Sequence, residues 1–482
     1  MAHETDGTTA TRTTRAQHLL LGGILLLAAA FRLPAIGRTS FWYDEAVSWS
    51  QSNGSLQHLL SSVAADNYPP LHNIVLWLTM KVAGDSETVL RFPSLVASLL
   101  AVFLIYRLGR TLFGTTAGLL AAFLLATSPF HLWYASEARM YALFDLAGLA
   151  MLLSIVAALG TGKRRSLLAV VLTTTAFLYT HIYALFGVTS VGLVLVIMCV
   201  SARPENRKPL MLTIGALVAA GILFLPWLIV LVGRARDVTA NGFWIAYPDL
   251  NFLIVMVRDM AGSEWLFMLL MVTALAGLAT SLFRQDPPAP ASKAAAVVVV
   301  IAAAAGPFIL AYTVSLTLQP ILFDRYLIAA WSAFLVLAAG GATRVGPRLA
   351  PLALGALSIY LAQDRIVFSL TDKIRPEWRT VASAYLSESS ESAPIVLTKA
   401  FARPAIAYYV RDDARVIATD RPEEIARVFS GQDEAWLLLA HSSRPEMARA
   451  VDAVPDGFAE DYRTHAFGWG ESGLTLIKYS TP

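Results

Sequence analysis

The sequence predicts an α-helical polytopic membrane protein that ends in a small α/β domain. Three observations lead to this fold class. Of the 482 residues, 56% are hydrophobic and only 15% are charged, with a mean hydropathy of +0.59, which is too apolar for an ordinary soluble protein. Apolar segments long enough to cross a bilayer recur up to about residue 364. Beyond that position, short apolar runs alternate with charged helical stretches.

The long apolar segments define the predicted membrane domain. A spanning helix needs about 17 to 25 predominantly apolar residues, because the hydrocarbon core is about 30 Å thick. About eleven segments meet or approach this length, and the fifth and the last are short. They are residues 18–36, 89–107, 114–132, 140–160, 166–181, 182–201, 209–232, 264–283, 294–317, 326–343 and 349–364.

The distribution of basic residues predicts which side each connection faces. Lys and Arg gather in alternate connections, with 14 in six short segments and 8 in the five opposite loops. Because cytoplasmic loops carry the excess of Lys and Arg, the larger set marks the cytoplasmic side. We therefore expect a multi-pass protein of a bacterial-type plasma membrane, with a cytoplasmic N-terminus and an extracytoplasmic C-terminal domain. The six basic segments are 12–15, 107–110, 163–165, 203–208, 284–293 and 344–348.

This orientation requires that residues 56–83 do not cross the membrane. The apolar run after the two prolines of this stretch is short, and a crossing there would reverse the side of the next basic segment. We expect a helix that lies on the outer membrane surface or packs within the bundle. The first outer loop then extends over 38–88 and contains the adjacent acids Asp44 and Glu45.

The C-terminal domain is predicted to hold a largely parallel sheet, because strands that alternate with helices favour parallel pairing. The predicted domains are therefore 1–364 and 365–482. Apolar runs typical of strands are 394–397, 415–418, 436–439 and 474–477. The helical stretches between them are 378–386, 404–410, 423–429 and 444–451.

Polar residues that this topology places on the outer side come from five separate parts of the chain. Two adjacent carboxylates among aromatic residues at a membrane surface are costly to keep without a use, so the acidic pair is the first candidate for chemistry. Loops at one mouth of a helix bundle can form a single cleft, which suits an enzyme with one lipid substrate and one polar substrate. The five groups are Asp44 and Glu45; Asp66 to His72; Ser136 to Tyr141; His181 and Tyr183; and Asp324 to Tyr326.

In their order along the chain, these motifs resemble glycosyltransferase family 39. This family belongs to the C-type integral-membrane glycosyltransferases, with protein O-mannosyltransferases and the lipid A aminoarabinose transferase as relatives. The resemblance covers about residues 18–390 and implies the C-type fold for the membrane domain. One position departs from it: relatives with an Asp-Lys-Pro-Pro segment have a lysine where this chain has Tyr68. The motifs are the Asp44-Glu45 pair, Pro69-Pro70-Leu71-His72, LRFPS at 90–94, SPFHLWYASEARMY at 128–141, and Asp324-Arg325-Tyr326.

The resemblance implies inverting transfer of a hexosyl or pentosyl group from a polyprenyl-phosphate donor to an acceptor hydroxyl of a glycan, lipid or protein. A carboxylate can take the hydroxyl proton during attack on the anomeric carbon, and we expect this base to be Asp44, with Glu45 completing the catalytic pair. Fixed cations stabilise the departing lipid phosphate, so Arg139 and Arg325 are expected to bind it. Further contacts are expected from His72 and Tyr326 at the phosphate, and from Glu137, Tyr68, Tyr141 and Asp324 at the acceptor or sugar.

Motifs for other ligands are absent from the sequence. It has no Gly-rich phosphate loop and no Asp-x-Asp pair of the kind that holds a metal against a nucleotide sugar, and one acidic pair offers few ligands for a cation. We therefore predict no cofactor and no obligatory metal, with the lipid-linked sugar as co-substrate. The net charge of +3 is not evidence for nucleic acid, so the expected partners are the donor, the acceptor and membrane lipid.

Structural roles compete with these assignments. The acidic pair could cap the helix that follows it, since acids favour helix N-termini. The two candidate arginines could anchor helix ends at the membrane interface. His181 is expected to be a helix-end histidine whose hydrogen bonds are satisfied within the fold, and Asp145, inside a predicted span, is expected to make a buried polar contact.

Two other functions are compatible with parts of the sequence. A secondary transporter would agree with the number of spans, but transporters place ionisable residues and broken helices near mid-membrane, often in two related halves. This sequence has neither an evident repeat nor several mid-span charges. An oligosaccharide ligase or polymerase that handles a lipid-linked glycan would share the outer-face chemistry and differ in its donor.

Overall fold

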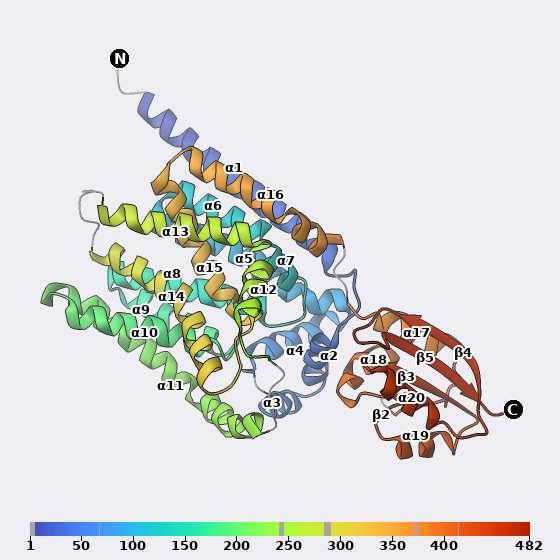
Figure 1. Ribbon diagram of the computed structural model, residues 1–482. Helices are drawn as coiled ribbons and strands as arrows, with labels where there is room; N and C mark the ends of the chain where they lie inside the picture. The colour runs from blue at the N-terminus through green and yellow to red at the C-terminus, as the bar shows by residue number, and fades with distance from the viewer. Residues whose placement is uncertain (1–4, 67, 241–244, 284–290, 372–374, 413) are drawn as a thin grey trace. The chain divides into compact units, whose positions relative to one another are not determined.

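The computed structural model describes residues 5–66, 68–240, 245–283, 291–371, 375–412 and 414–482. Asn67 and most of the predicted basic segment 284–293 lie outside the described residues. The chain divides into two compact units, and each is described by itself. Unit 1 comprises Met1–Ile36, Leu60–Val75 and Arg91–Asp372, and unit 2 comprises Gly37–Leu59, Leu76–Leu90 and Lys373–Pro482. Figure 1 labels the helices and strands along the chain.

The membrane helices occur where the sequence predicts them. Among the described residues, eight helices are long and apolar enough to cross a membrane, and two bent pairs raise the number to ten. The difference from the predicted eleven is α9 (Arg164–Leu178), whose 15 residues are too few to cross a bilayer. The eight are α1 (Thr5–Arg32), α5 (Glu87–Phe113), α8 (Tyr141–Thr161), α10 (Ala184–Ser201), α11 (Pro204–Ala240), α14 (Ala291–Thr317), α15 (Ile328–Val345) and α16 (Leu349–Thr371).

The two bent pairs break where the local sequence ends a helix. Helices α6 (Thr115–Thr127) and α7 (Pro129–Ala135) meet at 62°, because Ser128 is extended and Pro129 starts the next helix without an N–H group. Helices α12 (Leu250–Ala261) and α13 (Glu264–Phe283) meet at 81° across Gly262, whose φ of +96° favours glycine. The motif 128–141 starts at the first break and contains α7 and the turn that leads to α8.

The stretch 56–83 forms two short helices. They are α3 (Leu56–Ala64) and α4 (Leu71–Ala83), and each contains residues of both units. With 13 residues, α4 is apolar but too short for a span, in agreement with the predicted helix that does not cross.

A buried arginine joins the first helices of the bundle. The guanidinium of Arg32, at the end of α1, donates to Ser98 Oγ of α5 at 2.6 Å and to the main-chain carbonyls of Leu125 and Ala126 at the end of α6. It also donates to Nδ1 of His131 at 2.9 Å. These acceptors satisfy a charge that is 1% exposed.

The same network reaches α8 through an acid. With its Nδ1 accepting from Arg32, His131 carries its proton on Nε2 and donates to Asp145 Oδ2 at 3.1 Å. Both side chains are fully buried. The predicted buried polar contact of Asp145 is therefore confirmed.

Unit 2 contains a five-stranded sheet with the order β2-β1-β3-β5-β4. The strands β2, β1 and β3 are parallel, whereas β5 is antiparallel to both of its neighbours. The sheet is thus mixed. Strand β4 was not predicted, because its sequence AEDYRTHA carries few apolar residues and lies mostly exposed at the edge. The strands are β1 (Ile395–Leu397), β2 (Val416–Ala418), β3 (Glu434–Ala440), β4 (Ala459–Ala466) and β5 (Leu474–Ser480).

Alternate residues of the strands face two separate hydrophobic cores, as the period of two in a strand requires. Ile395 and Leu397 belong to one core and Val396 to the other. The first core is covered by α17 (Trp378–Glu388) and α18 (Arg403–Val410), and the second by α19 (Pro422–Phe429) and α20 (Arg444–Asp452).

A segment from the other end of the chain also belongs to the first core. Ala46 of α2 (Tyr43–Ser52) is fully buried and belongs to the same core as Trp378, Tyr385 and Trp436. The predicted boundary at 364/365 differs in two respects from these units. Helix α16 continues to Thr371, and the sheet unit includes part of the predicted first outer loop.

The substitution Arg32→Met is expected to destabilise the bundle by about 3–5 kcal/mol, because it leaves buried carbonyls and His131 without their donor. The measurement is the unfolding midpoint of the detergent-solubilised protein. Arg15→Met, at an exposed position of the same helix, is the control and is expected to leave the midpoint unchanged. Equal midpoints for the two variants would contradict a structural role of Arg32.

Candidate functional site

Hydrogen bonds of the loop between α9 and α10 join three segments of unit 1. The N–H group of Leu71 donates to the carbonyl of Tyr179 at 3.0 Å, which links the segment 68–72 to this loop. The hydroxyl of Tyr183, in the same loop, donates to the carbonyl of Ile321. That bond links the loop to the residues that precede η2 (Asp324–Leu327). Three of the predicted outer-side motifs therefore lie together.

The two predicted phosphate-binding arginines share one aromatic ring. The guanidinium carbon of Arg139 lies 5.3 Å from the ring centroid of Tyr68 and 6.0 Å from that of Tyr141. The guanidinium carbon of Arg325 lies 5.7 Å from the centroid of Tyr141 and 5.6 Å from that of Tyr326. The hydroxyls of Tyr68 and Tyr326 are 3.2 Å apart. A ring face attracts a cation, so these contacts hold both guanidinium groups in place.

Two buried side chains fix the backbone that carries Arg139. His72 donates from Nε2 to the carbonyl of Ala138 at 3.2 Å, and Ser94 donates from Oγ to the carbonyl of Arg139 at 3.2 Å. Burial and the charge of Arg139 lower the pKa of His72 to about 3, so the ring is neutral at physiological pH. Because the Nε2 proton of His72 is donated to the carbonyl of Ala138, the geometry favours a role in positioning Arg139.

The predicted positioning acids take different places in unit 1. Glu137 is fully buried two residues before Arg139. Asp324 starts η2, and its Oδ1 accepts from the N–H group of Arg325 at 2.6 Å. Tyr141, the first residue of α8, is fully buried.

His181 lies in the same cluster and was expected to have its hydrogen bonds satisfied. Its Nδ1 accepts from the N–H group of Tyr183 at 3.1 Å. Its buried Nε2 has no hydrogen-bond partner among the described residues. The expectation is therefore wrong for Nε2, one of the two ring nitrogens.

The acidic pair belongs to unit 2, in the first turn of α2. Glu45 is 1% exposed, and its carboxylate accepts from the N–H group of Trp42 at 3.4 Å. Asp44 is half-buried, and its carbonyl accepts from Ser48 Oγ at 3.0 Å. The helix cap that the sequence suggests is thus present, and it uses the side chain of Glu45.

Aromatic contacts hold α2 within unit 2. Trp42 lies edge-on to Trp469 with ring centroids 5.8 Å apart, and the guanidinium of Arg375 lies 4.5 Å from its ring. Further along the helix, the ring centroid of Trp49 lies 5.2 Å from that of Tyr408 of α18. Both tryptophans flank the acidic pair, so the pair is carried by a helix that is packed on the sheet domain.

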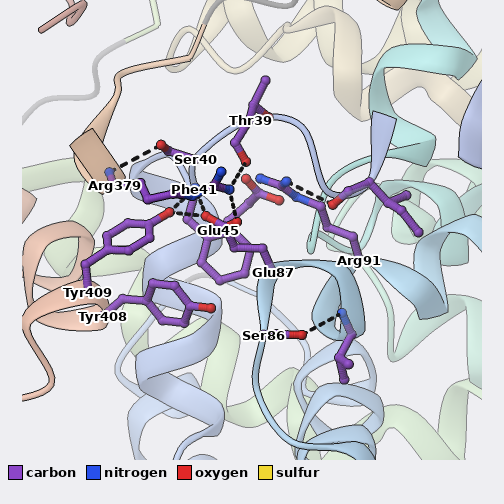
Figure 2. Close-up of polar contacts among 12 residues, drawn as sticks. Thr39, Ser40, Phe41, Glu45, Ser86, Glu87, Arg91, Arg379, Tyr408 and Tyr409 are labelled. Carbon is purple, nitrogen blue, oxygen red and sulfur yellow. Dashed lines mark hydrogen bonds and ion pairs between the residues drawn. The ribbon is translucent and has the colours of Figure 1, made fainter. Parts of the chain in front are cut away.

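A tyrosine of α18 fixes the start of α2, and Figure 2 shows it directed at Phe41 and Glu87. The hydroxyl of Tyr409 accepts from the N–H group of Phe41 at 2.7 Å and donates to the carboxylate of Glu87. Glu87 also pairs with Arg379 of α17. Burial and the charge of Glu87 raise the pKa of Tyr409, so the hydroxyl keeps the proton that it donates.

A second acid near the end of α4 makes a parallel set of contacts. Asp85 accepts from the indole N–H group of Trp49 at 3.0 Å and pairs with Arg411 after α18. Its carbonyl accepts from the hydroxyl of Tyr408 at 2.9 Å. Partial burial acts to raise the pKa of Asp85, but the bonds from Arg411 and Trp49 outweigh it and lower the pKa overall.

Sequence reasoning did not single out these partners of α2. Asp85 and Glu87 read as ordinary acids before a span, and Tyr408 and Tyr409 as helix residues of a separate domain. The one available signal is that both acids precede a span on the predicted outer side. Among the described residues, no group of three or more His, Cys, Asp or Glu side chains could hold a metal ion.

Comparisons with known proteins agree with this architecture. The profile of the family described as dolichyl-phosphate-mannose-protein mannosyltransferase matches residues 67–230, about a third of the chain. That range includes three of the five motifs, those at 69–72, 90–94 and 128–141. No curated protein sequence matches the chain.

Solved structures match over nearly the whole chain. ArnT from Cupriavidus metallidurans in the apo state has a TM-score of 0.66 at 12% identity, covering 97% of this chain and 98% of ArnT. ArnT bound to undecaprenyl phosphate has a TM-score of 0.63 at 12% identity, covering 95% and 97%. The archaeal oligosaccharyltransferase AglB from Archaeoglobus fulgidus, in complex with an inhibitory peptide and a dolichol-phosphate, has a TM-score of 0.56 at 11% identity, covering 88% and 69%.

At identities this low, the structural matches establish a shared fold only. The sequence similarity is shown by the profile match and by the order of the motifs. The two lines of comparison agree with each other. The chain is a polytopic membrane protein with the C-type glycosyltransferase fold and a C-terminal sheet domain, and its resemblance to glycosyltransferase family 39 is confirmed.

Proposed function

We propose that this chain transfers a sugar from a polyprenyl-phosphate donor to an acceptor hydroxyl, with inversion at the anomeric carbon. The observation that carries the proposal is the placement of Arg139 and Arg325 over the ring of Tyr141, in a fold shared with an ArnT structure bound to undecaprenyl phosphate. Two guanidinium groups offer planar pairs of N–H donors that match the oxygens of a phosphate. The lipid phosphate is the anion that this pair would bind.

Departure of the lipid phosphate is the step that these cations assist. The bond between the anomeric carbon and the phosphate oxygen breaks, and its electron pair stays on the oxygen. Arg139 and Arg325 stabilise that developing charge, and little water competes because Arg139 is 4% exposed. The hydroxyls of Tyr68 and Tyr326 bond to each other, and the pair adds one further neutral donor beside them.

Activation of the acceptor is the role proposed for Asp44. Its carboxylate takes the proton of the acceptor hydroxyl while that oxygen attacks the face of the anomeric carbon opposite the phosphate. The attack inverts the centre in one displacement, without a covalent intermediate. Glu45, whose carboxylate caps α2, orients the helix that presents Asp44.

The proposed setting is the outer face of a bacterial-type plasma membrane. The sugar is a hexose or a pentose, and the acceptor is a glycan, a lipid or a protein. We propose that no bound metal is required, because the leaving phosphate is met by arginines.

The C-terminal sheet domain is proposed to position the acidic pair. Trp42, Ala46 and Trp49 place one side of α2 on this domain, and Tyr409 fixes the chain just before the helix. The orientation of Asp44 therefore depends on residues more than 300 positions away in sequence.

Asp44→Asn is expected to lower kcat by about 100-fold or more, because asparagine keeps the size of the side chain but cannot take a proton. Affinity for undecaprenyl phosphate is expected to stay unchanged. The measurement is transfer from a panel of polyprenyl-phosphate sugars in membranes that contain each variant. Asp452→Asn, at an exposed position at the end of α20, is the matched control.

Unchanged turnover in the Asp44 variant would remove this residue as the base. If wild-type membranes use none of the donors while solute uptake depends on the chain, the transporter alternative replaces the proposed function.

Arg325→Ala is expected to weaken binding of undecaprenyl phosphate by about 10- to 100-fold, because hydrogen bonds to a charged group contribute about 1.5–3 kcal/mol. Equilibrium binding of the lipid to the purified protein measures this loss without requiring the sugar to be known. Arg165→Ala, exposed at the start of α9, is the control and should bind like wild type. Equal affinities of both variants would argue that Arg325 only anchors a helix end.

Tyr409→Phe is expected to lower kcat by on the order of tenfold while the affinity for undecaprenyl phosphate stays unchanged. Phenylalanine cannot accept from Phe41 or donate to Glu87, so the start of α2 loses its fixed position. The measurement is kcat beside lipid affinity, with Tyr462→Phe on the exposed strand β4 as the control. A variant that loses lipid affinity and keeps kcat would contradict this role of the sheet domain.

A further inference from the structure

His181 carries a buried proton donor that the proposed mechanism does not yet use. Its ring is fully buried in the loop between α9 and α10. Nδ1 accepts a hydrogen bond from the N–H group of Tyr183, and a nitrogen that accepts carries no proton. The proton of the neutral ring is therefore on Nε2. This nitrogen is buried and has no partner within the described part of the chain.

The protonation state of the ring follows from its surroundings. Burial lowers the pKa of His181 to about 3, and the charges of Arg139 and Arg325 act in the same direction. The ring is thus neutral at physiological pH and offers a single donor. A buried donor that stays unmatched is costly, so native proteins rarely keep one without a use.

The ring neighbours of His181 are the residues that hold the two guanidinium groups. Its ring centroid lies 4.9 Å from that of Tyr326, 5.5 Å from that of Tyr68 and 6.2 Å from that of Tyr141. Arg139 and Arg325 lie over these same three rings. The donor of His181 and both cations therefore share one buried, aromatic-walled cluster.

We propose that His181 is a further ligand of the donor phosphate, with Nε2–H donating to a non-bridging oxygen beside Arg139 and Arg325. This inference rests on the proposed function and names a third contact for the same anion. A phosphate offers several acceptor oxygens, and two arginines leave some of them for another donor. A neutral donor adds a hydrogen bond without a third positive charge, which would be repelled by the two guanidinium groups. An N–H group directed at a ring face would gain less than one directed at an anion.

Two substitutions separate the two nitrogens of the ring. In His181→Asn, the amide oxygen stands about where Nδ1 is and can accept from Tyr183, but the Nε2 donor is lost. In His181→Gln, the amide nitrogen reaches about as far as Nε2 and keeps a donor there. A purely structural histidine would be replaced better by asparagine, and a phosphate ligand better by glutamine.

The test is equilibrium binding of undecaprenyl phosphate to the full-length protein in detergent, with the unfolding midpoint of each variant measured alongside. His181→Asn is expected to bind about tenfold more weakly than wild type, and His181→Gln within about twofold of it. His58→Asn, at an exposed histidine of α3, is the matched control and is expected to bind like wild type.

The outcomes separate this inference from the proposed function. If wild type binds the lipid and the asparagine variant binds equally well, or if only the glutamine variant is weakened, His181 is not a phosphate ligand and the proposed function stands. If wild type does not bind undecaprenyl phosphate at all, the proposed function fails and this inference fails with it.

Discussion

The buried guanidinium of Arg32 is the interaction on which the first half of the helix bundle depends. In hydrocarbon no water can replace a missing partner, so each of its donors must end on the protein. They end on main-chain carbonyls of α1 and α6, on α5 and on His131, which in turn donates to Asp145 of α8. His131 belongs to the segment 128–141, so these bonds also anchor the segment that carries Arg139.

Two groups of polar side chains in unit 1 differ in what they contact. The guanidinium of Arg32 donates to α1, α5, α6 and His131, and these bonds join the helices. Around Tyr141, two guanidinium groups lie over neighbouring rings, and Nε2 of His181 has no hydrogen-bond partner within the described residues. Positive charge in a buried place is the electrostatic complement of an anion, which is the basis of the proposed phosphate site.

Much of the fold could be predicted from the length and period of apolar runs. Spans, the short helices at 56–83 and four of the five strands have such patterns, whereas the edge strand 459–466 does not, because exposed strands need few apolar residues. The contact of Ala46 with the sheet domain could not be predicted. An apolar face of a helix indicates that the helix packs against another element, but it does not identify that element in the sequence. The hydrogen bonding of His181 could not be predicted either, because the sequence shows the residue and only the fold shows which of its two nitrogens has a partner.

The packing of α2 on the sheet domain has a consequence for biosynthesis. Phe41 and its partner Tyr409 are 368 residues apart, so at about 5–20 residues per second synthesis separates them by roughly 20 to 70 s. During that interval Trp42 and Trp49 lack the surface that buries them, and the acidic helix cannot take its native position. Helix α2 can therefore reach its native position only after the C-terminal sheet domain has been synthesised. A chain that stops before α17 contains the membrane-spanning helices of the described residues but none of the sheet-domain residues that contact α2.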